Sequence, residues 1–199
     1  MSRGLPSFEI AEISSSVVVA SWPAFLQGKY RAHLAKFNAT GFASKADLQP
    51  SVRSISVMEA VMRVRTAMRK GNAEDPSEND RDDCFVCFVL DGFEACCSCS
   101  LLTSSERQLM TGPPKKVRVA SRKARNEDDI TYLQSTSIFA RELDAVFLLR
   151  FMASLPTMLS HYNVLNGGGG SMAGPGAFPA FEQRVPLFLK CLSEVLQVL

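Results

Sequence analysis

The chain has 199 residues and a formal net charge of +2, with 46% hydrophobic and 21% charged residues. This composition is typical of a globular protein with a real core, and the small charge excludes a global attraction to nucleic acid or to a membrane surface. No apolar run reaches the roughly 18 residues of a membrane-spanning helix, and the N-terminus lacks the pattern of a signal peptide. We therefore expect a soluble domain in a reducing compartment.

The first part of the chain predicts strands followed by a helix. Residues 8–21 contain a run of valines among other β-prone residues, which is typical of one long bent strand or two short ones. The apolar residues of 22–37 fit a helix face as well as a strand, and we favour a strand. Residues 57–70 predict a helix, because Ser56 and Glu59 match a capping box ahead of apolar residues at helical spacing.

The clearest local pattern lies in residues 84–102, which hold five of the six cysteines. The pair Asp91-Gly92 separates two β-prone runs, and such a pair favours a type I′ β-hairpin. A two-residue turn fixes the register, so Cys84 and Cys87 would point to opposite faces of the sheet. The acidic segment before the hairpin, residues 72–83, predicts an exposed loop.

The cysteine spacing also allows a metal site as an alternative. Cys84-x-x-Cys87 and Cys96-Cys97-x-Cys99 resemble the paired knuckles of a structural zinc site. Thiolates on opposite faces of a hairpin do not converge on one ion, and free cysteine is often a buried small hydrophobe. We therefore expect reduced core thiols, with no metal and no cofactor.

The second part of the chain predicts short strands and a closing helix. Strand candidates lie at residues 117–120 and 130–133, and residues 137–161 carry apolar side chains at helical spacing. Pro156 is expected to kink this helix or to end it early.

Together these elements predict an α+β fold. Its antiparallel sheet is built around the 84–102 hairpin, and its helices lie near residues 57–70 and 137–161. Several strands followed by a terminal helix are compatible with a pleckstrin-homology-like barrel, on architecture alone.

The most specific feature is the run Gly-Gly-Gly-Gly-Ser at residues 167–171, followed by Met172. Such a run forms a flexible coil without a packing role, and the methionine resembles the start of a second reading frame. We interpret the chain as an engineered fusion of an interaction domain, residues 1–166, through this linker to a helical segment of a binding partner, residues 172–199. A natural low-complexity loop is the alternative interpretation.

The segment after the linker predicts an amphipathic helix. Its apolar residues recur at steps of three and four, which indicates a stripe that lies in an apolar groove. A C-terminal helix native to the same domain would pack in the same way. The predicted partner-binding residues are Phe181, Val185, Phe188, Leu192, Val195 and Leu199.

No pattern of catalytic residues is present in the sequence. The chain has two histidines, His33 and His161, which we expect to be ordinary, partly exposed residues, and it lacks phosphate-binding loops and nucleophile elbows. The expected function is therefore a non-enzymatic scaffold or adaptor domain. It would capture an apolar helix from the N-terminal region of a second protein, in a nuclear complex or, alternatively, in the cytoplasm.

A basic cluster between residues 115 and 125 is the reason for expecting a nuclear location. It follows Pro113-Pro114 and resembles a nuclear-localisation signal, although a solvated loop is an equally simple interpretation. The alternative function is a nucleic-acid-associated subunit that uses this loop for phosphate contacts, but the loop lacks aromatic residues for base stacking. The basic residues are Lys115, Lys116, Arg118, Arg122, Lys123 and Arg125.

The import hypothesis predicts that a fluorescent reporter carrying residues 112–126 enters the nucleus without the folded domain, because such signals are read as extended peptides. Microscopy measures the result, and a reporter with the six basic residues changed to glutamine is the control. A reporter that stays outside would contradict import. Duplex binding by the intact protein that weakens steeply with salt would then indicate phosphate contact.

Overall fold

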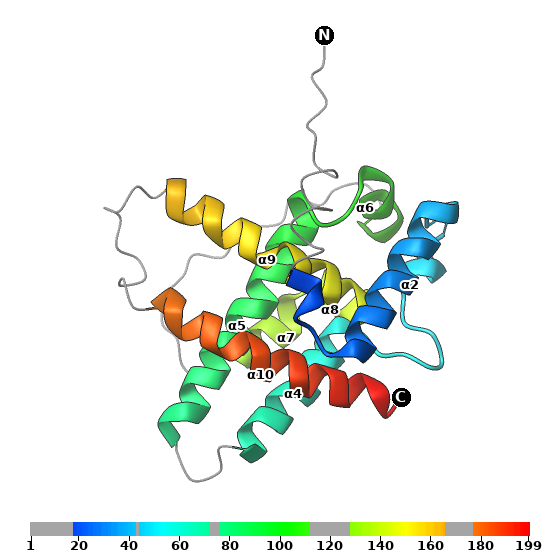
Figure 1. Cartoon of the computed structure of the whole chain (residues 1–199). Coiled ribbons are helices and arrows are strands. Elements are labelled where there is room, and N and C mark those ends of the chain that lie inside the picture. The colour runs from blue at the N-terminus through cyan, green and yellow to red at the C-terminus, as the bar shows by residue number, and fades with distance from the viewer. Residues whose placement is uncertain (1–17, 43, 72–75, 112–127, 166–176) are drawn as a thin grey trace.

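The structure is a computed structural model that describes residues 18–42, 44–71, 76–111, 128–165 and 177–199 (Figure 1). The described part of the chain is built from helices and contains no strand; its one β-type contact is an isolated bridge between Ser56 and Asp144. The α+β prediction, with its antiparallel sheet and barrel, is therefore wrong. The helices are α2 Ala24–Thr40, α3 Lys45–Leu48, α4 Val57–Gly71, α5 Pro76–Cys99, α6 Ser104–Thr111, α7 Asp128–Thr136, α8 Phe139–Glu142, α9 Val146–Leu165 and α10 Ala177–Gln197.

The predicted hairpin at residues 84–102 is replaced by most of α5, the longest of these helices. Its buried residues recur at steps of three and four, which is the period of a helix and not that of a strand. Burial of this face against other helices outweighs the β propensity of the individual phenylalanine, valine and cysteine residues. The buried face consists of Asp82, Phe85, Val86, Val89, Leu90, Phe93 and Cys97.

The pair Asp91-Gly92 lies inside α5 and forms no turn. Asp91 is exposed, and Gly92 faces α9, where a Cβ atom would lie 3.0 Å from Cζ of Phe151. Phe151 is fully buried, so its ring has little room to move away. The glycine therefore serves close approach between two helices, and the turn interpretation of this pair is wrong for that reason.

Other predicted elements have mixed outcomes. The helix at 57–70 is confirmed by α4, and the Ser56 hydroxyl accepts a hydrogen bond from the Glu59 amide at 3.2 Å. The predicted strand at 22–37 is wrong because residues 24–37 lie in α2, and the strand at 130–133 is wrong because these residues lie in α7. The acidic loop is wrong for residues 76–83, which begin α5. The predicted strand at 117–120 and residues 8–17 of the first predicted strand lie outside the described residues. The described end of that first strand is wrong, because residues 18–20 are helical.

The predicted helix at 137–161 is divided into α8 and α9, because backbone hydrogen bonds hold the chain between them. The Leu143 carbonyl accepts from the Val57 amide at 2.9 Å, and the Asp144 amide donates to the Leu48 carbonyl at 2.9 Å. These bonds go to distant segments instead of to the preceding helical turn, so the helix is interrupted. Pro156 does not end α9, which continues to Leu165.

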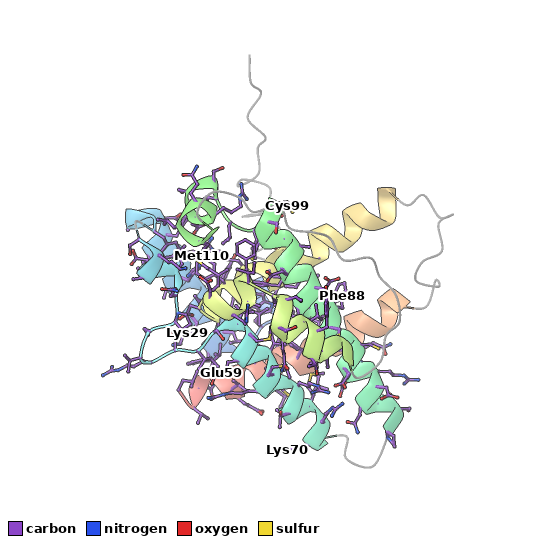
Figure 2. All side chains as sticks on the ribbon, turned by 180° about the vertical axis from the view of Figure 1, so that it is seen from behind. Lys29, Glu59, Lys70, Phe88, Cys99 and Met110 are labelled. Atoms are coloured by element: carbon purple, nitrogen blue, oxygen red, sulfur yellow. The ribbon has the colours of Figure 1, made fainter. Side chains whose placement is uncertain are left out.

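A single hydrophobic cluster joins the helices. α4 and α5 pack against each other, α9 packs against α2, and α10 lies across α4 and α5 (Figure 1). Each of these helices contributes fully buried side chains, among them Leu26, Val61, Phe85, Phe147 and Phe188. In the view from behind, Glu59 and Lys70 mark the two ends of α4, and Phe88 marks the middle of α5 beside it (Figure 2).

A carboxylate on α5 fixes the start of the short helix α8. Glu94 accepts hydrogen bonds from the backbone amides of Ile138, Phe139 and Ala140 at 2.6, 3.0 and 3.1 Å. These amides belong to the first turn of α8, where no helical carbonyl is available to them. A side chain 44 positions away in sequence thus holds α8 against α5.

By length and composition, no single helix of the described residues qualifies as a membrane span, and α5 with α6 qualifies only as a pair bent by 111°.

We predict that Gly92→Val lowers the free energy of unfolding by about 1–3 kcal/mol, because the new side chain meets the buried Phe151 ring. The control is Gly28→Val in α2, where nothing lies within 4 Å of an added Cβ and stability should change little or rise. Urea unfolding of both variants measures the difference. A Phe151→Leu change in the Gly92→Val protein should recover part of the loss, and equal stability of the two valine variants would contradict this packing.

Candidate helix-binding site

The structure places the predicted stripe of α10 against the rest of the chain. Phe188 and Leu192 are fully buried, and Val185 and Val195 are partly buried against the hydrophobic core. Leu199 is 43% exposed, so the stripe ends before it. Phe181 falls in α10, but its side chain lies outside the described residues. Three further apolar residues of α10 are buried as well: Leu189, Cys191 and Leu196.

The groove that receives α10 is formed by α4, with contributions from α5 and α2. Phe188 meets Phe85 of α5 edge to face, with ring centroids 5.5 Å apart and an interplanar angle of 72°. This geometry is among those that aromatic pairs prefer. Phe188 is thus a central residue in the apolar contact between α10 and the rest of the chain.

Charged residues close one side of this groove. Arg184 of α10 donates from Nη2 to Glu78 at 2.6 Å and from Nη1 to Asp82, both of which lie on α5. The Arg184 side chain is 11% exposed, and Asp82 is completely buried. The hydrogen bond from Arg184 is the largest cause that lowers the pKa of Glu78, so this carboxylate is ionised at neutral pH. We call Asp82, Glu78 and Arg184 the arginine clamp.

A second set of ion pairs, next to Asp82 in sequence, joins α4 to α5. Asp83 accepts two hydrogen bonds from Arg65 of α4, from Nε at 2.8 Å and from Nη2 at 2.7 Å, and it also pairs with Arg69. Burial alone raises the pKa of Asp83, but the hydrogen bonds from the two arginines outweigh burial and lower the pKa below its usual value. These ion pairs tie α4 to α5, which form two walls of the groove.

A separate cluster of charged residues lies inside the protein. Arg150 of α9 donates from Nη1 to the two carboxylate oxygens of Glu106 at 3.0 and 3.2 Å, and from Nε to Nε2 of His33 at 2.7 Å. The three residues are at most 9% exposed. The guanidinium also lies over the rings of Phe37, Phe42 and Phe147 at 4.9, 5.5 and 4.7 Å.

His33 is therefore not the partly exposed residue that the sequence analysis expected. Burial, the charge of Arg150 and then that of Lys36 lower its pKa from 6.5 to about 3, so the ring is neutral. A neutral ring can accept at Nε2 the hydrogen bond that Arg150 donates. The cluster joins α2, α6 and α9, and its enclosure indicates a structural role. The other histidine, His161, has a side chain outside the described residues.

The cysteines lie on several faces of α5 and α10. Cys97 and Cys191 are buried, whereas Cys84 and Cys99 are exposed, so the expectation of core thiols is wrong for Cys84 and Cys99. Burial, with a smaller effect of Cys99, raises the pKa of Cys96 to about 11, which keeps this thiol protonated. Within the described residues, no group of three or more His, Cys, Asp or Glu side chains is placed to hold a metal ion, and no disulfide is formed.

The predicted basic cluster, Lys115 to Arg125, and the linker at 167–171 lie outside the described residues. Sequence patterns do not indicate the arginine clamp or the buried cluster around Arg150. Asp82 and Arg184 are 102 positions apart, and Arg150 and His33 are 117 positions apart. No local spacing signals such pairs.

Comparisons with protein-family models, with curated proteins and with solved structures found no match to this chain.

The low pKa of His33 predicts a pH-dependent stability. The unfolded chain binds a proton at this histidine near pH 6.5 while the folded chain does not until about pH 3. Stability from this group is thus complete above pH 6.5 and declines as the pH falls. We expect a loss of about 2 kcal/mol between pH 7.5 and 5, measured by urea unfolding. His33→Gln keeps an acceptor and should show a flatter profile; identical profiles would contradict the prediction.

Proposed function

We propose that residues 1–166 form a non-enzymatic adaptor or scaffold domain, helical in its described part, that captures an apolar helix of a second protein. The groove of α4, α5 and α2 is the binding site, and α10 represents the captured helix. The observation that carries this proposal is the complete burial of Phe188 and Leu192 together with the arginine clamp at the edge of the same groove.

The apolar contacts support capture in energetic terms. Full burial of a phenylalanine or leucine side chain contributes about 1.5–3 kcal/mol each, and α10 buries several such side chains. A linker of five residues makes the association intramolecular, at an effective concentration in roughly the millimolar range. Even an interaction that is weak between separate proteins would then be populated.

The cellular setting of this proposal depends on the basic cluster at 115–125. We propose a nuclear complex, and the reporter experiment described above tests it independently of helix capture. Phosphate contact by the same residues is the alternative outcome of that experiment.

Capture can be tested on the folded, intact chain. A protease site placed within residues 167–171 allows the linker to be cut after folding, and size-exclusion chromatography then shows whether the α10 segment stays bound. We expect co-elution of the two pieces at micromolar concentration. Separation of the pieces on mild dilution, with the larger piece still folded by circular dichroism, would contradict capture.

Point variants of α10 test whether its buried apolar residues provide the binding energy. We predict that Leu192→Asp weakens docking by at least about 3 kcal/mol, because it places a charge at a fully buried position. Gln183→Asp adds the same side chain at an exposed position of α10 and should leave docking nearly unchanged. Dissociation constants after linker cleavage measure both effects, and equal affinities of the two variants would show that the stripe is misassigned.

A further inference from the structure

The arginine clamp has a feature that apolar packing does not require, namely a fully buried carboxylate. Asp82 is 0% exposed and belongs to the same face of α5 as Phe85 and Val86. Taking a carboxylate out of water costs several kcal/mol, and an opposite charge of good geometry is needed to offset that cost. The guanidinium of Arg184, which is supplied by α10, is such a partner.

The geometry of the clamp suits arginine better than lysine. Glu78 and Asp82 are four residues apart, so they lie one above the other on α5, and Arg184 contacts them with different nitrogens. A planar guanidinium can span two carboxylates in this way, whereas an ammonium group is a single point of charge. The groove therefore distinguishes the two kinds of cation.

The clamp also fixes the register of the bound helix. Arg184, Phe188 and Leu192 are spaced by four residues, so they lie on the same side of α10. If the helix slid by one turn, Ala180 or Phe188 would lie opposite Asp82 in place of the arginine. Either shift would leave the buried carboxylate without the guanidinium. Only one alignment of the helix therefore places Arg184 against Asp82 and Phe188 in its apolar contacts at the same time.

This inference rests on the proposed function. We propose that the groove selects its partner by an arginine placed one turn before a buried aromatic anchor, in the pattern Arg-x-x-x-Phe-x-x-x-Leu of residues 184–192. The partners are amphipathic helices that carry this pattern. Helices that have the apolar stripe but lack the arginine are rejected, because they bury Asp82 without that cation.

The test measures dissociation constants after linker cleavage in chains that carry single and double changes. Arg184→Leu should weaken binding by about 100-fold or more. Arg184→Lys keeps the positive charge but lacks the planar guanidinium with its several donors. Its dissociation constant should lie between those of Arg184→Leu and the wild type. The matched control Lys190→Leu removes a positive charge from an exposed position of α10 and should change the affinity by less than about threefold.

The decisive measurement is a reversal of preference. In a chain with Asp82→Leu, the Arg184→Leu helix should bind more tightly than the wild-type helix, because an apolar pair then replaces the ion pair. Asp82→Asn removes the charge but disturbs the packing less than leucine does. In a chain with this change, most of the preference for arginine over leucine at position 184 should also be lost. Urea unfolding of the uncut chains gives the same double-mutant cycle independently of dissociation.

The outcomes separate this inference from the proposed function. If the wild-type α10 segment leaves the groove as soon as the linker is cut, capture itself fails and the selection rule fails with it. If the wild-type segment stays bound but Arg184→Leu binds equally well in the chain that keeps Asp82, capture stands and the selection rule is overturned. A preference for arginine that is the same in the wild-type and Asp82→Leu backgrounds would also overturn it.

Discussion

Helix α5 packs against its neighbours along one face, and the rest of the structure depends on that constraint. Near its N-terminal end, Asp82 meets Arg184 of α10, and two to three turns later Gly92 leaves room for Phe151 of α9. Between these points, Phe85 lies against Phe188 of α10. These contacts share one face only if the segment is a continuous helix, so a helix is the conformation that satisfies α9 and α10 together.

Two arginines, Arg150, which is buried, and Arg184, which is mostly buried, hold different parts of this arrangement together. Arg150 joins α9 to α6 and α2, so its partners all belong to residues 1–166. Arg184 instead connects residues 172–199 with Glu78 and Asp82 of the larger part. Since buried ion pairs add little net stability compared with apolar packing, their effect is to restrict which arrangements are acceptable. Arg150 restricts the packing of α9 against α6 and α2, and Arg184 restricts how α10 is placed against α5.

The sequence predicted those elements whose local signals agree with their tertiary contacts. In α4, a capping box and an apolar stripe point to the same helix, and the stripe of α10 around Phe188 and Leu192 was predicted for the same reason. In α5, apolar residues at exposed or partly exposed positions, such as Cys84 and Phe88, obscured the helical period, and Gly92 resembled a turn residue. The partners of Arg184 could not be predicted, because only the fold brings them together.

Apolar burial and charge have separate consequences for helix capture. Burial of Phe188 and Leu192 favours any amphipathic helix of similar shape, so the stripe alone provides affinity without selection. We propose that Asp82 changes this balance, because a helix that brings the guanidinium of Arg184 offsets part of the cost of burying this carboxylate. At the high effective concentration that a short tether provides, even poorly matched helices would bind. In the proposed capture, discrimination therefore comes from the buried carboxylate, because a helix with the guanidinium offsets its desolvation cost and a helix without it does not.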